Sequence, residues 1–312
     1  MVNTPENVSF KISIIIPTFN SGAYLTKCLE SIRFQNDNNI EVIVIDGCSL
    51  DNTIDIIKMN LDLVNIFISE KDSGQGDAVT KGIRLATGEV LHWHASDDLM
   101  LPRALDRVRH AFITNPNAKL VISDGLALLN NRIVRTGACR WLNYRVALFH
   151  YGRFQSDCAY WKRSISYRGL PLDISQPLSV DEDFFLKIWS NEFHCRVKSP
   201  LGLFRVRSGQ LSTMLSRDQL KYDRLRTRKF IFVRDNISYV KQKALKIFTF
   251  PEHIMRNIIL HKIYYFHLFI LRKIYHNNSR YDMAKKMYQF DKSTDLDNSR
   301  KIFNEIGDIE LY

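Results

Sequence analysis

Four short apolar segments alternate with helical patterns in the first hundred residues, and this alternation restricts the fold more than any other feature. The apolar segments are KISIIIPTF (11–19), IEVIVID (40–46), VNIFISE (64–70) and GEVLHWHAS (88–96). The intervening segments space their apolar residues as helices do, with Leu25, Leu29 and Ile32 as the first example. Continuous β-branched runs joined by helices predict a parallel sheet that is covered on both faces. Such sheets bind ligands at the carboxyl ends of their strands.

The later part of the chain changes character near residue 216. Before it come a predicted helix (103–115), a strand (118–125) and a second helix (181–191) that begins in acids, as the helix dipole favours. From Arg217 the sequence is helical in pattern, basic and rich in aromatic residues. We therefore predict an α/β domain over residues 10–215 and a basic amphipathic helical extension over residues 216–312.

The positive charge belongs almost wholly to that extension. Residues 217–312 contain 20 Lys and Arg against 11 Asp and Glu, whereas residues 1–216 contain 24 against 22. This excess predicts an anionic partner, which could be membrane lipid, a lipid-phosphate substrate or nucleic acid. The sequence contains no recognised nucleic-acid-binding motif, so we expect no nucleic acid.

The cysteines and the amino terminus bear on location. The chain has five cysteines, an odd number, with no C-x-x-C pair. This usage favours a reducing cytosol over a disulfide framework. The first residues do not resemble a secretory signal, and no run of about 18 apolar residues occurs, so neither a leader nor a membrane-spanning helix is expected.

Polar residues follow three of the predicted strands, at the points where the strands end. They are Pro17, Thr18 and Asn20 after the first strand, Asp46 after the second, and Asp97 and Asp98 after the fourth. Each cluster alone is better explained by a helix cap or a turn. Because the carboxyl ends of parallel strands share one edge, the three clusters together favour a site. Paired carboxylates beside such a crevice suit a divalent cation that neutralises a diphosphate.

Two other sequence features do not indicate a specific functional site. His92 and His94 lie two apart on the fourth strand and point to one face, where they either bind a metal or form a packed, hydrogen-bonded face. We favour packing, because no Cys or His partner has suitable spacing. The glycine-rich DSGQGDAVTKG (72–82) has neither dinucleotide-binding nor P-loop spacing, which argues against a dehydrogenase or a P-loop enzyme.

Four motifs occur in order along this region, SIIIPTFNSGAYLTKCLESI, EVIVIDGCSLDNT, SEKDSGQGDAVTKGI and ATGEVLHWHASDD. The series resembles the family 2 inverting glycosyltransferases with the GT-A fold, over about residues 10–215. The resemblance implies a mostly parallel nucleotide-binding sheet flanked by helices. It also implies transfer of a sugar from a nucleotide-sugar donor, with a UDP-sugar as first choice, to a saccharide or lipid-linked acceptor. The most similar subgroup builds bacterial surface polysaccharides such as O-antigen, at the cytoplasmic face of the membrane and peripheral to it.

The same resemblance assigns roles to individual residues. It places Pro17, Thr18, Asn20 and Asp46 around the nucleoside, Asp77 and Lys81 near the uridine and phosphates, Asp97 at the ribose or donor sugar, and Asp98 on Mg2+ or Mn2+. Ser96 stands where the literal D-x-D motif has its first acid.

The segment that resembles the acceptor half of the family contains the expected catalytic base. The acid before the DFFL helix matches it, so the role falls on Asp181, with Asp183 as second choice. One base is enough, because it takes the proton of the attacking hydroxyl while the leaving diphosphate needs only charge neutralisation. From the residues alone, a negatively charged first helical turn is the favoured explanation of these acids. Trp161 either stacks on a sugar ring or lies in the core, and Arg207 is placed to contact the diphosphate.

The extension contains an apolar and aromatic segment, His253–His276, that Lys262 and His267 interrupt. It suits a helix lying in an anionic membrane interface, or one packed on the catalytic domain. Two functions other than sugar transfer are alternatives for this chain. One is a non-catalytic nucleotide-sugar or membrane-binding module with a degenerate site. The weaker is a glycoside hydrolase, which needs two carboxylates flanking one bond.

Overall fold

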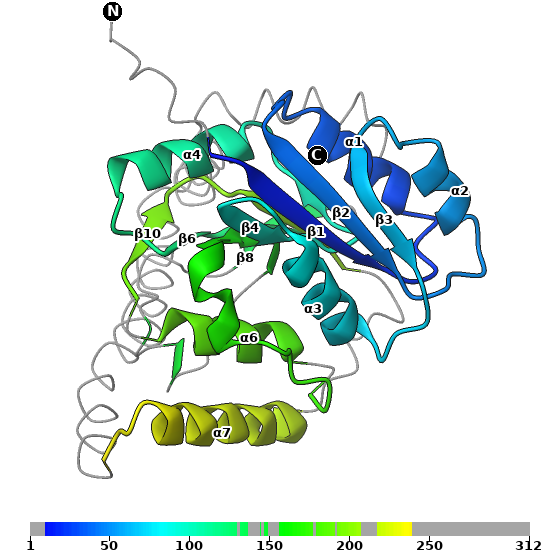
Figure 1. Cartoon of the computed structure of the whole chain (residues 1–312). Helices are drawn as coiled ribbons and strands as arrows, with labels where there is room; N and C mark the ends of the chain where they lie inside the picture. Colours follow the sequence, from blue (N-terminus) through cyan, green and yellow to red (C-terminus); the bar gives the residue numbers. More distant parts are fainter. Residues whose placement is uncertain are drawn as a thin grey trace, which may run out of the picture.

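Two β-sheets and six α-helices make up the computed structural model, which describes residues 10–129, 132–136, 144, 147–148, 156–176, 179–190, 192–206 and 217–238 (Figure 1). The larger sheet has the order β10-β6-β9-β4-β1-β2-β3, with β1 (Ile12–Thr18), β2 (Ile40–Asp46), β3 (Val64–Ser69), β4 (Val90–Trp93), β6 (Leu120–Ser123), β9 (Ala159–Lys162) and β10 (His194–Val197). The smaller sheet has the order β5-β11-β7-β8, with β5 (Leu99–Met100), β7 (Gly125–Leu129), β8 (Arg132–Thr136) and β11 (Gly202–Arg205).

The helices confirm the predicted alternation of strands and helices. They are α1 (Leu25–Arg33), α2 (Thr53–Lys58), α3 (Gln75–Leu85), α4 (Ala104–Thr114), α6 (Val180–Trp189) and α7 (Arg217–Arg234), with 3-10 turns η2 (Ser156–Cys158) and η3 (Arg163–Arg168).

The strands confirm the predicted parallel sheet in its central part. The four predicted strands of the first hundred residues are β1 to β4, and β1 pairs in parallel with both β2 and β4. Strand β9 departs from this parallel arrangement, because it lies between β4 and β6 and is antiparallel to both.

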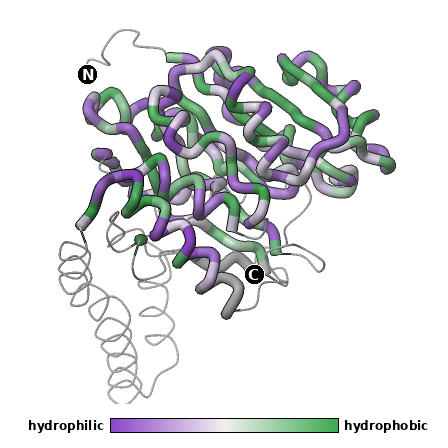
Figure 2. The backbone as a smooth tube through the Cα atoms, turned by 60° about the horizontal axis from the view of Figure 1, so that its bottom comes forward, coloured by the Kyte–Doolittle hydropathy of each residue, from purple (hydrophilic) through white to green (hydrophobic). Residues whose placement is uncertain are grey.

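The residues of β1 show how the sheet is covered on both faces. Ile14 and Ile16 pack with α1, α2 and α4, whereas Ile15 packs with α3 and α6. Successive residues of a strand point to opposite faces, so an unbroken apolar run is what a doubly covered strand requires. Figure 2 shows these apolar runs as green stretches along the strands, while the helices mix green with purple.

Two packing details position the site. A Cβ atom at Gly82 would lie 2.4 Å from Cγ2 of Ile15, so the glycine lets α3 lie directly on β1. On the same side of the sheet α6 packs into the core, and α7 lies against the outer side of α6 (Figure 1). Helix α7 lies within the predicted helical extension, and the part of that extension beyond residue 238, including His253–His276, lies outside the described residues.

Candidate active site

The ends of β1 and β2 meet at a buried carboxylate. Asp46 is fully buried, and its Oδ1 accepts hydrogen bonds from the hydroxyls of Thr18, 3.3 Å away, and Ser49. Its Oδ2 accepts from the backbone N–H of Ser49 at 3.0 Å and from the Ser69 hydroxyl at 2.7 Å. The Asp46 carboxylate therefore organises the loops after three neighbouring strands. A direct contact of Asp46 with a nucleoside stays a prediction.

The loop after β1 is tied to the loops after β2 and β4. Asn20 has a φ of 47°, and its side-chain oxygen accepts a hydrogen bond from the Leu50 N–H at 2.8 Å. The hydroxyls of Ser21 and Ser96 lie 2.7 Å apart. Pro17 is buried within β1 itself. The predicted convergence of the three strand ends is thus present, and Ser96 serves as a link where the literal motif has an acid.

The acid pair after β4 is buried. Asp97 is 7% exposed and Asp98 is 2% exposed. Oδ1 of Asp98 accepts a hydrogen bond from the backbone N–H of Arg205 at 3.0 Å, which holds the carboxylate against β11. Burial, reinforced by the charges of Asp157 and Asp97, raises the pKa of Asp98 well above its ordinary value. A cation bound next to Asp97 and Asp98 would stabilise their ionised carboxylates.

A third acid, Asp157, joins the pair. It lies in the segment QSDCAYWKRS, which resembles the acceptor half of the family, but the sequence assigns it no role. It lies in η2, is 2% exposed, and its Oδ2 has no hydrogen-bond partner within the described part of the chain. Burial raises the pKa of Asp157 to about 7, and the charges of Asp181 and Asp97 add to the effect. Acids from the end of β4, from η2 and from the start of α6 therefore share one electrostatic environment.

This acid cluster fits a cation that arrives with a substrate. Among the described residues, no three His, Cys, Asp or Glu side chains form a ready metal cage. Mg2+ is commonly held by only one or two carboxylates together with substrate phosphates. The buried and unpartnered Oδ2 of Asp157, beside the buried Asp98, supplies donors of that kind.

His92 of β4 and His94, which follows that strand, are packed in the interior. His92 stacks on Tyr160, with ring centroids 4.0 Å apart, and its Nδ1 lies 3.0 Å from the Ala159 carbonyl oxygen. Its Nε2 lies 3.3 Å from Nδ1 of His94. Burial lowers the pKa of His94 to about 4, so both rings belong to a neutral packed face, as we favoured from the sequence.

The first acid of α6, Asp181, has a different environment from the acids around it. Asp181 is half-buried, and its Oδ1 accepts a hydrogen bond from the Glu182 N–H at 2.8 Å. Burial raises the pKa of Asp181 above its ordinary value. A half-buried carboxylate with a raised pKa has the properties of a general base.

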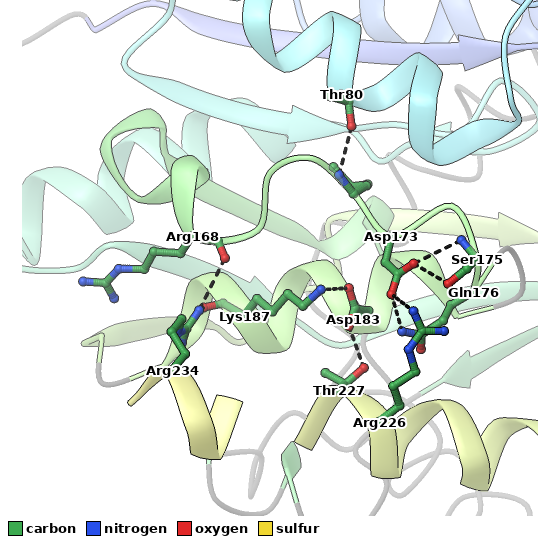
Figure 3. A network of polar contacts seen from close by, with 11 residues as sticks. Thr80, Arg168, Asp173, Ser175, Gln176, Asp183, Lys187, Arg226, Thr227 and Arg234 are labelled. Carbon is green, nitrogen blue, oxygen red and sulfur yellow. Dashed lines mark hydrogen bonds and ion pairs between the residues drawn. The ribbon is translucent and has the colours of Figure 1, made fainter. Parts of the chain in front are cut away.

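The next two acids of α6 are engaged in ion pairs with their neighbours. Glu182 pairs with Arg224 of α7 at 2.7 Å. Asp183 is 2% exposed, pairs with Lys187 at 2.6 Å and accepts a hydrogen bond from the Thr227 hydroxyl at 2.6 Å (Figure 3). Lys187 and Thr227 thus occupy the Asp183 carboxylate, which favours Asp181 over Asp183 as the base.

Asp77 and Lys81 lie on α3, close to the end of β3. Nζ of Lys81 is 2.8 Å from Glu70 and 3.4 Å from Asp77, whose Oδ2 also accepts a hydrogen bond from the Ser73 N–H at 3.1 Å. The amino end of α3 touches that of α6, because a Cβ at Gly76 would lie 2.9 Å from Cγ2 of Val180. Asp77 and Lys81 therefore lie on a helix whose amino end borders that of α6.

Trp161 is a structural residue, and the sugar-stacking interpretation is wrong. Its side chain is fully buried in β9 and packs on Phe184 and Phe185, with ring centroids 5.3 Å and 5.5 Å away. Its Nε1 donates a hydrogen bond to the Ser166 hydroxyl at 2.9 Å. The other residue assigned to the pocket, Arg207, lies outside the described residues.

We expect Trp161→Phe to lower the free energy of unfolding by about 1–3 kcal/mol, because it leaves a cavity and an unpaired Ser166 hydroxyl. The KM for the acceptor should not change. Urea unfolding and steady-state kinetics measure the two quantities. Tyr167→Phe is the matched control, since Tyr167 is 69% exposed and its replacement should change stability by less than about 0.5 kcal/mol. A higher acceptor KM at unchanged stability would restore the stacking interpretation.

Comparisons with known proteins identify similar glycosyltransferases. Residues 13–124 match the model of glycosyl transferase family 2. The PGL/p-HBAD biosynthesis glycosyltransferase of Mycobacterium tuberculosis is 32% identical over 194 residues, covering 57% of this chain and 70% of the relative. The glycosyltransferase GlyG of Streptococcus pneumoniae is 31% identical over 116 residues, covering 36% and 38%.

Solved structures show the same fold at low sequence identity. S. aureus TarS 1–349 in complex with UDP-GlcNAc has a TM-score of 0.62 at 17% identity, covering 78% of this chain and 73% of that one. The mannosyltransferase PcManGT from Pyrobaculum calidifontis, in complex with GDP-Man and Mn2+, has a TM-score of 0.56 at 17% identity, covering 82% and 74%. These likenesses establish the GT-A fold that the sequence predicts.

Proposed function

Because the chain belongs to glycosyl transferase family 2 and is a glycosyltransferase, we propose that it moves a sugar from a nucleotide-sugar donor to a saccharide acceptor with inversion at the anomeric carbon. The observation that carries this proposal is the electrostatic contact between acids of the donor side and of the acceptor side. Asp97 and Asp98 come from the end of β4, Asp181 begins α6, and Asp157 interacts with all three.

The acceptor step assigns the base. The acceptor hydroxyl attacks the anomeric carbon from the side opposite to the nucleotide, and the bond to the diphosphate oxygen breaks with its electron pair. The proton of the hydroxyl goes to Asp181, whose raised pKa makes it a better acceptor than an ordinary Asp. Asp183 is better explained as a structural residue, because Lys187 and Thr227 occupy its carboxylate.

The donor step assigns the remaining residues. We propose that Asp97 binds the ribose or the donor sugar, and that the linked loops carrying Thr18, Asn20 and Asp46 border the nucleoside. A bound Mg2+ or Mn2+ would offset the negative charge that develops on the leaving diphosphate. Asp98 and Asp157 are the side chains that fit such an ion.

The donor and the acceptor are proposed more narrowly from similar proteins. TarS is crystallised with UDP-GlcNAc and PcManGT with GDP-Man, which supports a nucleotide-sugar donor for this fold. We retain a UDP-sugar as the first choice from the sequence resemblance. The name of the mycobacterial relative refers to PGL/p-HBAD biosynthesis, and we propose a saccharide on a lipid carrier, in surface polysaccharide assembly, as the acceptor here.

A donor screen tests the function. The full chain with Mn2+ is incubated with UDP-, GDP- and dTDP-sugars, and released nucleoside diphosphate is measured. We expect slow hydrolysis that is fastest with one UDP-sugar and is lost in Asp98→Asn. Binding of UDP without release from any donor would instead indicate the non-catalytic module.

Membrane association is a separate part of the proposal. Within the described residues no helix is both long and apolar enough to cross a bilayer. The basic composition of residues 217–312 supports peripheral attachment to an anionic surface at the cytoplasmic face.

A further inference from the structure

The helix α7 turns several of its charged and polar residues toward the protein. On its inner face Asp223 lies 3.0 Å from the Ser179 hydroxyl, and Thr227 bonds to Asp183 at 2.6 Å. Near its end Arg234 donates to the Lys187 carbonyl oxygen at 2.9 Å (Figure 3). Ile231 is buried in the core, whereas other apolar residues of the helix are exposed on the opposite face.

The opposite face carries a line of exposed residues that we call the outer stripe, Tyr222, Leu225, Lys229 and Val233. Their spacing of three, four and four residues places them on one side of a helix. Tyr222 is 63% exposed, Leu225 50% and Val233 75%. Among the described side chains of α7, no exposed residue is acidic. An apolar stripe with only positive charges is unusual for a face that meets water alone.

Charge identifies what this surface should meet. Three occupants are conceivable, namely residues 239–312 of the same chain, a second copy, and an anionic lipid surface. Residues 239–312 contain 13 Lys and Arg against 8 Asp and Glu, and the whole chain has a net charge of +11. Both protein candidates therefore carry net positive charge, as do Lys229 of the stripe and the neighbouring exposed Arg226, whereas anionic headgroups attract these two side chains. Tyr, Leu and Val beside Lys are also the residues of helices that lie in a membrane interface.

We propose that the outer stripe of α7 docks on an anionic phospholipid surface, with the helix lying in the plane of the bilayer. The inner face of the same helix is bonded to α6, which begins with the acids 181–183. Docking would thus hold the helix that carries the proposed base beside the membrane. The docking itself does not depend on the transfer chemistry, and it is measured without it.

Vesicle flotation of the full chain tests the docking. We compare vesicles of phosphatidylcholine alone with vesicles that also contain phosphatidylglycerol. The wild type should float only with the anionic vesicles, and less as salt increases. The variant Leu225→Glu/Val233→Glu should bind at least roughly tenfold more weakly, because it removes apolar contacts and adds like charge to the surface.

A matched control adds the same two negative charges at exposed apolar residues outside α7. Met59 and Leu61 are 74% and 56% exposed and lie beside α2. Met59→Glu/Leu61→Glu should therefore bind as the wild type does, apart from the small general effect of two added charges. Unchanged donor hydrolysis in both variants would show that the fold is intact. If the wild type itself did not hydrolyse any donor, this result would count against the proposed function and not against docking.

A fluorescent label separates the other occupants. An environment-sensitive dye on Val233→Cys, in a Cys48→Ser background, should shift to the blue with anionic vesicles only. A dye already shielded without lipid would show that the C-terminal segment or a second copy covers the stripe, and would overturn the proposal. The proposal would also be overturned if the wild type did not bind anionic vesicles, or if the stripe variant bound them as well as the wild type does.

Discussion

Asp181→Asn is expected to lower kcat by about three orders of magnitude while the protein stays folded. An Asn of the same size can still accept the Glu182 N–H hydrogen bond, but it cannot take a proton from the acceptor hydroxyl. The KM for the donor should change little, because the loss falls on the chemical step. Single-turnover transfer, with thermal unfolding measured in parallel, separates the two effects.

The pH profile gives the same prediction a second readout. Burial raises the pKa of Asp181, so the base stays protonated to a higher pH than an ordinary Asp with a pKa near 3.9. The value of kcat/KM should therefore rise with pH on the acid side, through a pKa above that value. In Asp181→Asn this limb should disappear from the residual activity.

Asp183→Asn is the matched control, and its expected effect is on stability. The change leaves Lys187 buried without its carboxylate partner, which costs about 3–5 kcal/mol for a buried ion pair. Turnover per folded molecule should stay within about tenfold of the wild type. If Asp183→Asn abolished turnover in a folded protein while Asp181→Asn kept it, the two roles would have to be exchanged.

The parallel core was predictable because its signal is local. An unbroken β-branched run as short as the one in β1 favours a strand covered on both faces, and the spacing of the apolar residues around Gly82 predicts a helix. The antiparallel β9 was not predictable, since its partners β4 and β6 are set by the packing of distant segments.

The omission of Asp157 follows from that missing strand direction. Parallel strands place their carboxyl ends at the site, so the sequence points to the residues after each strand. Because β9 runs the opposite way, the residues that precede it lie at that same edge, where His92 of β4 is paired with Tyr160. An acid two residues before an apolar strand is a local signal that points to Asp157.

The distinction among the acids of α6 also required the structure. Asp183 is bonded to Thr227, which is 44 residues away, and nothing in either local sequence indicates that contact. The buried position of Trp161 depends in the same way on Phe184 and Phe185 of another element. Local patterns identify residue types suited to a site, whereas their use depends on partners that are distant in sequence.

Asp98→Asn should abolish most transfer and yet leave the protein at least as stable as the wild type. Asn can still accept the Arg205 N–H hydrogen bond, but one negative charge leaves a group of buried carboxylates. In the folded wild type the pKa of Asp98 is raised, so its contribution to stability falls as pH rises above the unfolded value near 3.9. Because Asn does not ionise, this loss of stability with rising pH disappears in the variant. Without divalent cation, the Tm of the variant near pH 7 should therefore equal or exceed that of the wild type.

Activity should respond in the opposite direction to stability. With one carboxylate less, we expect the Mn2+ concentration for half-maximal activity to rise at least about tenfold and kcat to fall by about two orders of magnitude. Asp97→Asn is the control, because a residue that binds the ribose or the sugar should raise the donor KM and leave the Mn2+ requirement as it is. An equal change of the Mn2+ requirement in both variants would show that the two carboxylates act on the cation together, and would remove the separate roles assigned to them.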